Sequence, residues 1–491
     1  MTEVVVDGTT LTVHDVEAVA RGGVEVRLCD AARARMVASE EAFNAAGARE
    51  ILQHKWEWLV GGPPPNGEHE LVRRFVEGHC AGVGEPLPHD EVRALLLCRA
   101  NALAVGWSGV RPALVERLLE LLRRDWIPVV PALGSVGAAG GVALAHLARV
   151  ALGLGGGLWV DGTQVPAADR IAALTPLRAT GKEALSLING STLATALGAL
   201  AVARGRRVLR AAESACALTM EVVRADLHAL AAPAASARNH PGVATAAAHL
   251  RSLLAGSELV SAGRRPDSFS VRCAPAVLGA ARDGCDHVQL VVERELNSAS
   301  DNPLVFPDLG VVEGGNFHGA PVALAMDHLK LALVQVAGIA ERRVFRMTYG
   351  QLSGLPSFLV PSSGVNSGLM LAQYTAASLT SEAKMLAVGA SIDTIPTVQH
   401  QEDHVSMGAN AARSALEVVD RVADVVAIEL LAAAQGLDLR LDADPQPAVG
   451  VGTREIHARV RARVKRWVDD RVLHPDLASL GDALRAGAFD A

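Results

Sequence analysis

Long stretches with helical periodicity constrain this chain more than any other feature of its sequence. In these stretches Ala and Leu are interspersed with Arg, Glu and Asp at intervals of three and four residues, which is the period of an α-helix. Several stretches exceed twenty residues, and rods of that length indicate a bundle with one shared core. The predicted helices cover residues 70–80, 90–105, 111–124, 193–230, 244–255, 280–297, 321–346, 368–388 and 405–435.

The rest of the chain predicts little other regular structure. Val4–Val6 and Leu11–Val13 flank a turn at Asp7-Gly8 and predict a short hairpin. No Ser/Gly/Pro-rich linker or block of like charge divides the chain, which favours lobes that pack together over separate domains joined by linkers. The expected fold is mainly α, a bundle of long helices with a small mixed N-terminal lobe. We expect residues 1–200 to form that lobe and residues 201–491 to form the long central bundle and the C-terminal helices.

Composition and charge exclude several classes of function. Half of the 491 residues are apolar, and the net charge of −7 leaves Lys and Arg scattered singly, so nucleic acid is not an expected partner. The apolar stretches 142–160 and 185–202 contain polar residues and several glycines, so no membrane span is expected. The six cysteines lie far apart without a CxxC pair, and the start of the chain has no export signal. The expected location is the reducing cytoplasm.

Glycine-rich and polar motifs lie at the breaks between the predicted helices, where a rigid helical framework places chemistry. The most informative motif is GSVGAAGGVALAH at residues 134–146. With the motifs given below, it makes the chain resemble the aromatic amino acid lyases over essentially its whole length, and the histidine ammonia-lyase branch fits best by length and by His79. The other motifs are GHCAGVGEP at 78–86, RANALA at 99–104, LING at 187–190, SVRC at 270–273, SDNPL at 300–304, GNFHG at 315–319, NSGL at 366–369 and QEDHVSMG at 401–408.

The resemblance implies a mainly helical homotetramer whose active sites are built from several subunits. It also implies an electrophilic methylidene-imidazolone, which forms when an internal Ala-Ser-Gly tripeptide cyclises and loses water. Here the tripeptide is Ala138-Ala139-Gly140, and the Asp that usually follows it is Gly141. A methyl group has no leaving group, so cyclisation of this degenerate loop would give no alkene. We therefore expect no prosthetic group.

The resemblance also implies two active-site tyrosines that this chain lacks. The two tyrosines of the sequence, Tyr349 and Tyr374, lie elsewhere. The segment KWEWLVGG at 55–62 stands in place of the loop that carries one, and Phe269 stands in place of the other. Phenylalanine retains the ring but lacks the hydroxyl, so it can pack against a substrate but cannot transfer a proton.

Several residues match family positions that line the substrate pocket. Arg272 is expected to clamp a substrate carboxylate, because a guanidinium donates two parallel hydrogen bonds, and its alternative role is to bridge helices. For the asparagines among them, the alternative role is helix capping or turn formation. The predicted substrate-binding residues are Asn189, Phe269, Arg272, Asn316, Phe317 and Gln401.

His79 and Glu402 are the expected catalytic residues. Imidazole titrates near neutrality, and burial can raise the pKa of a carboxylate towards it. As an alternative, His79 bonds a helix end. His400 and His404 have the i, i+4 spacing of metal ligands on a helix, but His404 belongs to the family pattern without metal, so no metal is expected. Cys80, beside His79, is interpreted as an inert thiol.

Three hypotheses about function stay open. The favoured one is a repurposed enzyme of amino acid metabolism, which acts on an amino acid or a small aromatic carboxylate by acid-base chemistry without the electrophile. The second is a non-catalytic homologue that binds a ligand or assembles with a partner, including a paralogous lyase. The third is a conventional ammonia-lyase for histidine or an aromatic amino acid.

Overall fold

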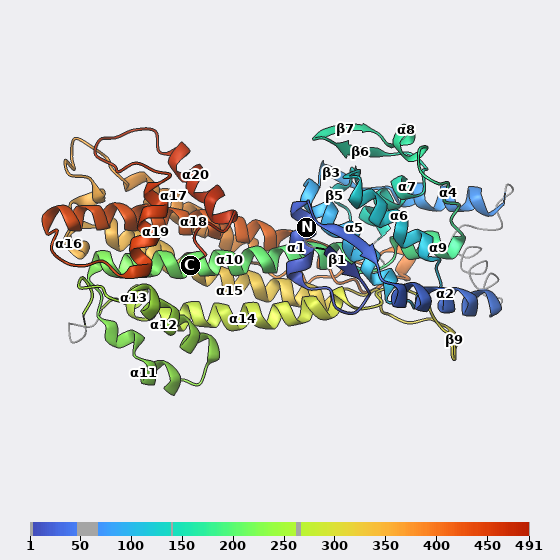
Figure 1. Cartoon of the computed structure of the whole chain (residues 1–491), viewed down its shortest axis with the longest axis horizontal. Coiled ribbons are helices and arrows are strands. Elements are labelled where there is room, and N and C mark those ends of the chain that lie inside the picture. The colour runs from blue at the N-terminus through green and yellow to red at the C-terminus, as the bar shows by residue number, and fades with distance from the viewer. Residues whose placement is uncertain (1–2, 47–66, 139–140, 262–266, 491) are drawn as a thin grey trace. The chain divides into compact units, whose positions relative to one another are not determined.

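The computed structural model describes residues 3–46, 67–138, 141–261 and 267–490 (Figure 1). These residues are mainly helical, which confirms the predicted fold class. Contacts divide the chain into two compact units. Unit 1 holds residues 1–200, 289–327 and 389–413, and unit 2 holds residues 201–288, 328–388 and 414–491. Neither unit is a continuous segment, and the division at residue 200 into a lobe and a bundle stays a prediction.

The chain begins with a parallel pair of strands in unit 1. Strand β1 (Glu3–Val6) pairs in parallel with β2 (Glu25–Leu28), and helix α1 (Val13–Arg21) connects them. The predicted hairpin is therefore wrong. Thr12 caps α1 by accepting a hydrogen bond from Asp15 N, while the Asp15 carboxylate accepts one from Thr12 N, so the predicted second strand begins a helix instead.

Helix α5 (His89–Ala104) is buried along nearly its whole length and packs against α1, α2 (Asp30–Ala45) and α6 (Pro112–Arg123). Three small antiparallel sheets accompany them: β3 with β5, β8 with β9, and a three-stranded sheet in the order β4-β6-β7. The remaining elements of unit 1 are α4 (Glu68–His79), β3 (Val83–Pro86), β4 (Ile127–Pro128), β5 (Pro131–Leu133), α7 (Gly141–Ala151), β6 (Gly157–Val160), β7 (Thr163–Pro166), α8 (Ala167–Ile171), α9 (Gly181–Ile188), β8 (Leu304–Phe306), β9 (Gly310–Val312) and η3 (Val398–His400).

Four long helices have most of their residues in unit 2: α10 (Thr192–Val223), α14 (Ala274–Leu296), α15 (Ala320–Thr348) and α18 (Gly408–Ala443). All nine predicted helices are present. The one predicted for residues 193–230 stops at Val223, because Arg224 has a positive φ of 54°. The shorter helices of unit 2 are η1 (Leu227–Leu230), α11 (Ala232–Ala237), α12 (Pro241–Leu253), α13 (Phe269–Arg272), α16 (Gly350–Ser353), η2 (Ser357–Leu359), α17 (Met370–Leu386), α19 (Val451–Arg461) and α20 (His474–Arg485).

An ion pair lies in the core of unit 2. Arg343 of α15 and Glu429 of α18 are both fully buried, and two hydrogen bonds of 2.5 and 2.8 Å join them. Thr219 of α10 donates a third hydrogen bond to Glu429 at 2.8 Å. Three of the long helices are therefore joined through one carboxylate.

Two helical stretches, residues 181–223 and 320–348, are long and apolar enough to cross a membrane by length and composition. The apolar window of the first is 94 % buried inside the structure, and that of the second is 56 % buried. Buried core helices of globular proteins have the same length and composition, so these stretches give only weak evidence for a membrane span.

Candidate functional site

The segment that precedes the Ala138-Ala139-Gly140 tripeptide is held by two other breaks in the chain. The carbonyl oxygen of Gly137 accepts hydrogen bonds from Gly319 N at 3.0 Å and from Ser406 Oγ at 2.6 Å. Met407 N donates to the carbonyl of Val136 at 2.7 Å. Three motifs that lie far apart in the sequence thus meet within unit 1.

Packing around this segment requires glycine at residue 137 and buries Ala138. Gly137 has a φ of 77°, and a Cβ atom there would lie 2.3 Å from Gly408 N. Ala138 forms a small apolar cluster with Val405 and Met407, against which Phe317 packs. Of the predicted site residues, Ala138 and Phe317 therefore lie together. Ala139 and Gly140 lie outside the described residues, as does segment 55–62.

His79, the last residue of α4, lies against the first residue of α7. Its Nδ1 is 2.7 Å from the carbonyl of Phe75, so we assign the proton to Nδ1 and leave Nε2 as the acceptor. A Cβ atom added at Gly141 would lie 2.8 Å from His79 Cδ2. The imidazole thus occupies the space that an aspartate at this position would need. His79 makes the predicted helix-end bond and also lies beside the residue that follows the tripeptide.

Glu402 is anchored by the strained turn that precedes it. Thr397 Oγ1 donates to Glu402 Oε2 at 2.6 Å, and Thr397 N donates to the Glu402 carbonyl at 2.9 Å. Between them, Val398, Gln399 and His400 all have positive φ values, of 47°, 51° and 68°. The left-handed region is costly for a β-branched residue such as Val398, so its neighbours must hold it there. Gln401 is exposed.

His404 pairs with another histidine. His318 Nε2 lies 3.2 Å from His404 Nδ1, and the two rings stack with 5.2 Å between their centroids. The described residues contain no group of three or more His, Cys, Asp or Glu side chains that could hold a metal ion. The i, i+4 spacing of His400 and His404 therefore gains no further ligand from that part of the chain.

Asn189 takes part in a buried polar network. Its Nδ2 donates to the Asn302 carbonyl at 2.9 Å and lies 3.3 Å from Asp301 Oδ1. Asp301 accepts hydrogen bonds from Lys182 at 3.0 Å and Ser186 at 2.7 Å, and all these side chains are buried. The amide group of Asn189 thus joins α9 to residues 301 and 302, which is neither of the roles, helix capping or turn formation, given above as the alternative. Asn316 is exposed, and its Nδ2 lies 3.4 Å from the Ala299 carbonyl.

The charges of this network shift the pKa values of its members. Burial opposes ionisation of Asp301, but Lys182, Arg99 and the Ser186 hydroxyl outweigh burial and hold its pKa below the usual value. Burial lowers the pKa of Arg99 to about 10, and the attraction of Asp301 opposes this change. Asp301 is therefore ionised between two buried cations at neutral pH.

Phe269 and Arg272 belong to unit 2, on the short helix α13. Phe269 is 69 % exposed, and the guanidinium carbon of Arg272 lies 4.9 Å from the centroid of its ring. This distance is that of a cation–π contact. Both side chains are exposed, which leaves the Arg272 guanidinium accessible to a carboxylate.

Glu295 is a site residue that the sequence interpretation missed. It lies on α14 and accepts a hydrogen bond from Ser191. Ser191 is a neighbour of Gly319, because a Cβ atom added at Gly319 would lie 3.3 Å from the Cβ atom of Ser191. Glu295 therefore supports the residues that hold Gly137. Burial raises the pKa of Glu295, and the Ser191 hydroxyl opposes this rise. A single Glu in an amphipathic helix gives no sequence signal for such a position.

The family model for aromatic amino acid lyases matches residues 11–462. The chain belongs to this family. It is 44 % identical to histidine ammonia-lyase from Anaeromyxobacter sp. (strain K) over the full length of both proteins. It is 41 % identical to histidine ammonia-lyase from Caldanaerobacter subterraneus subsp. tengcongensis, covering all of this chain and 98 % of the relative. The crystal structure of histidine ammonia-lyase from Trypanosoma cruzi matches 99 % of this chain and 94 % of its own, with a TM-score of 0.91 and 36 % identity.

The favoured hypothesis of a repurposed enzyme without the electrophile is wrong. Relatives of this chain that are 41–44 % identical over its full length are named histidine ammonia-lyase, and they support the third hypothesis, a conventional lyase. The earlier interpretation gave three local departures more weight than similarity along the whole chain. The expected membership of a lyase family is confirmed.

The prosthetic group of this lyase family is a separate chemical question. The tripeptide needs a side-chain hydroxyl as leaving group, and residue 139 is alanine. Residues 138–140 therefore do not fit a methylidene-imidazolone, and no step can be derived through it. Its absence stays a prediction.

Proposed function

We propose that this protein eliminates ammonia from histidine, the activity given in the names of its relatives. The observation that carries the proposal is the 44 % identity to a histidine ammonia-lyase along the whole of both chains. The geometry of unit 1 supports it, because His79 lies beside Gly141, which follows the tripeptide, and Phe317 packs against the cluster that contains Ala138. The proposed location is the cytoplasm.

The residues of this chain offer distinct contacts for each part of histidine. The Glu402 carboxylate is held by Thr397 and can accept a charge-assisted hydrogen bond from the substrate imidazole or ammonium. His79 presents Nε2 as its basic atom because Nδ1–H is bound to the Phe75 carbonyl, so it can accept a substrate proton. Phe317 provides an apolar wall for the ring. Asn189 can contact substrate only through Oδ1, because its Nδ2 is already bonded.

Four further exposed residues have side chains that suit parts of a substrate: Phe269 and Arg272 in unit 2, and Asn316 and Gln401 in unit 1. Arg272 suits the substrate carboxylate because a guanidinium donates two parallel hydrogen bonds, and Phe269 offers a ring beside it. Asn316 and Gln401 are exposed amides with donors and acceptors for substrate. In a homotetramer, these residues are available to sites that more than one subunit builds.

A homotetramer is the proposed assembly. Unit 2 exposes large apolar side chains on α15 and α17: Leu331 is 58 % exposed, Tyr374 65 % and Met385 67 %. Exposed apolar residues of this size mark surfaces that other chains cover. We expect light scattering of the purified protein to give the mass of four chains, and Leu331→Asp with Tyr374→Asp to give smaller species. A monomer for the unchanged protein would contradict this assembly.

The proposed reaction is tested by incubating the purified protein with L-histidine and measuring ammonia and the α,β-unsaturated imidazole acid together. We expect both products in equal amounts. Glu402→Gln should lower kcat/KM roughly ten- to a hundredfold, because one charge-assisted hydrogen bond is lost. Glu120→Gln, on the surface of α6, is the matched control and should leave kcat/KM unchanged. Failure of the unchanged protein to release ammonia, or indifference to Glu402→Gln, would contradict the proposal.

The absence of the prosthetic group is proposed separately and has its own measurement. We expect the peptide that contains residues 138–140 to have the mass of its unmodified sequence, and a loss of water would contradict this. Ala139→Ser restores the hydroxyl. If only this variant loses water and only this variant releases ammonia, the pocket accepts histidine but the unchanged protein does not perform the proposed elimination.

A further inference from the structure

The three-stranded sheet of unit 1 carries a half-buried tryptophan. Trp159 of β6 lies opposite Ile127 of β4 and Gln164 of β7. Leu158 and Ile127 are fully buried, whereas Trp159 is half-buried and Gln164 is exposed. The part of a large indole that lines a pocket provides a flat surface on which a ligand can stack.

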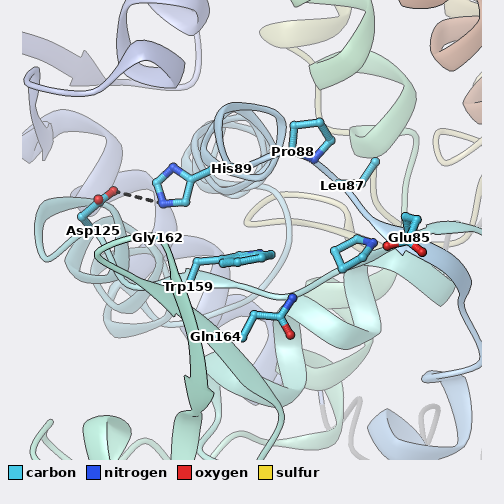
Figure 2. Close-up of a pocket in the computed structure, with 9 residues that line it drawn as sticks. Glu85, Leu87, Pro88, His89, Asp125, Trp159, Gly162 and Gln164 are labelled. Carbon is cyan, nitrogen blue, oxygen red and sulfur yellow. Dashed lines mark ion pairs between the residues drawn. The ribbon is translucent and has the colours of Figure 1, made fainter.

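A pocket of about 580 Å³ lies between this sheet and the start of α5. This volume falls within the range of small-molecule sites. Figure 2 shows the indole of Trp159 between the side chains of His89 and Gln164. Pro86 and Pro88 add rigid apolar surface. The pocket shares no residue with the candidate lyase site.

The charges of the pocket favour a positive ligand. Glu85 and Asp125 line it, and its lining within the described part of the chain contains no Lys or Arg. Asp125 Oδ1 lies 3.6 Å from His89 Nε2 and also contacts Arg93, which does not line this pocket. Because Arg93 already pairs with Asp125, Glu85 is the carboxylate whose charge is available to a ligand.

The start of α5 does not reverse this preference. A helix N-terminus attracts anions through its dipole, but the first turn of α5 carries Asp90 and Glu91, which offset that field. The indole nitrogen of Trp159 is buried, and within the described residues it has no hydrogen-bond partner. Buried donors without an acceptor are rare, and an oxygen atom of a ligand could accept this hydrogen bond.

We propose that this pocket binds a small organic cation. Its ammonium group stacks on Trp159 and pairs with Glu85. Attraction between a cation and an indole face accounts for the stacking, and the neighbouring carboxylate adds an ion pair. The site is additional to the lyase reaction and does not depend on it.

Calorimetric titration of the full-length protein tests the proposal with three probes of similar size: benzyltrimethylammonium, benzyl alcohol and benzoate. We expect the cation to bind at least about tenfold more tightly than the neutral and anionic probes. Trp159→Leu should weaken its binding roughly tenfold, and Glu85→Gln, which changes an exposed side chain, should weaken it several-fold. Trp126→Leu is the matched control, because Arg124 and Arg170 already cover that ring.

Three results would overturn the proposal. One is binding of benzoate as tight as that of the cation. Another is binding of the cation that neither Trp159→Leu nor Glu85→Gln weakens. The third is binding that Glu402→Gln abolishes, because the probe would then occupy the lyase site. Circular dichroism of each variant checks that a loss of binding does not come from unfolding.

Discussion

Replacement of Arg343 by methionine is expected to lower the free energy of unfolding by about 3–5 kcal/mol. Arg343 and Glu429 are both fully buried and share two hydrogen bonds. Removal of the guanidinium leaves a carboxylate inside the core, and the hydroxyl of Thr219 is then its one hydrogen-bond donor among the residues that the structure describes. The cost of such an uncompensated buried charge exceeds the loss of the pair itself.

Urea denaturation followed by circular dichroism measures this effect. The double variant Arg343→Met, Glu429→Met should recover most of the loss, because two apolar side chains of similar volume can replace a buried ion pair at little cost. Arg466→Met breaks the more exposed pair with Asp442 and is the control, with an expected change within about 1 kcal/mol. A single variant as stable as this control would mean that Glu429 is not held by charge.

The sequence predicted the long helices well because their signal is local and repeated many times. A break in one helix was not predicted, since no Gly or Pro marks the positive φ of Arg224. The first strands were misread for a different reason. Parallel pairing of β1 with β2 joins residues far apart, whereas the local alternation of Val4–Val6 and Leu11–Val13 looks like a hairpin. The capping residues Thr12 and Asp15 were the overlooked signal.

At the candidate site, the motifs showed which breaks matter but not how they meet. The contact of His79 with Gly141 and the anchoring of Glu402 by Thr397 depend on backbone positions that tertiary structure sets. The left-handed turn at residues 398–400 has no glycine to indicate it. The favoured function was wrong because the missing hydroxyl at residue 139 concerns one chemical step only. The similarity to histidine ammonia-lyases extends over the whole chain.

Asp301→Asn is expected to cost about 3–5 kcal/mol at pH 7, because Lys182 and Arg99 would remain buried without their carboxylate. The pKa of Asp301 in the folded protein lies below its usual value of 3.8, so its stabilising effect is complete above that pH. As the pH falls below about 3.8 and approaches the folded-state pKa, the unchanged protein loses the same charge. The difference in stability between the two proteins should therefore shrink in acid.

Glu295→Gln is the matched control for Asp301→Asn, since both replace a carboxylate of unit 1 by its amide, Asp301 being buried and Glu295 half-buried. Burial raises the pKa of Glu295, so ionisation above the usual value of 4.5 costs stability in the folded state. The amide should therefore leave stability at pH 7 unchanged or raise it by on the order of 1 kcal/mol. Urea denaturation of both variants from pH 7 to pH 3 measures the contrast. Equal losses for the two variants would show that shape, and not the sign of the surrounding charge, governs these positions.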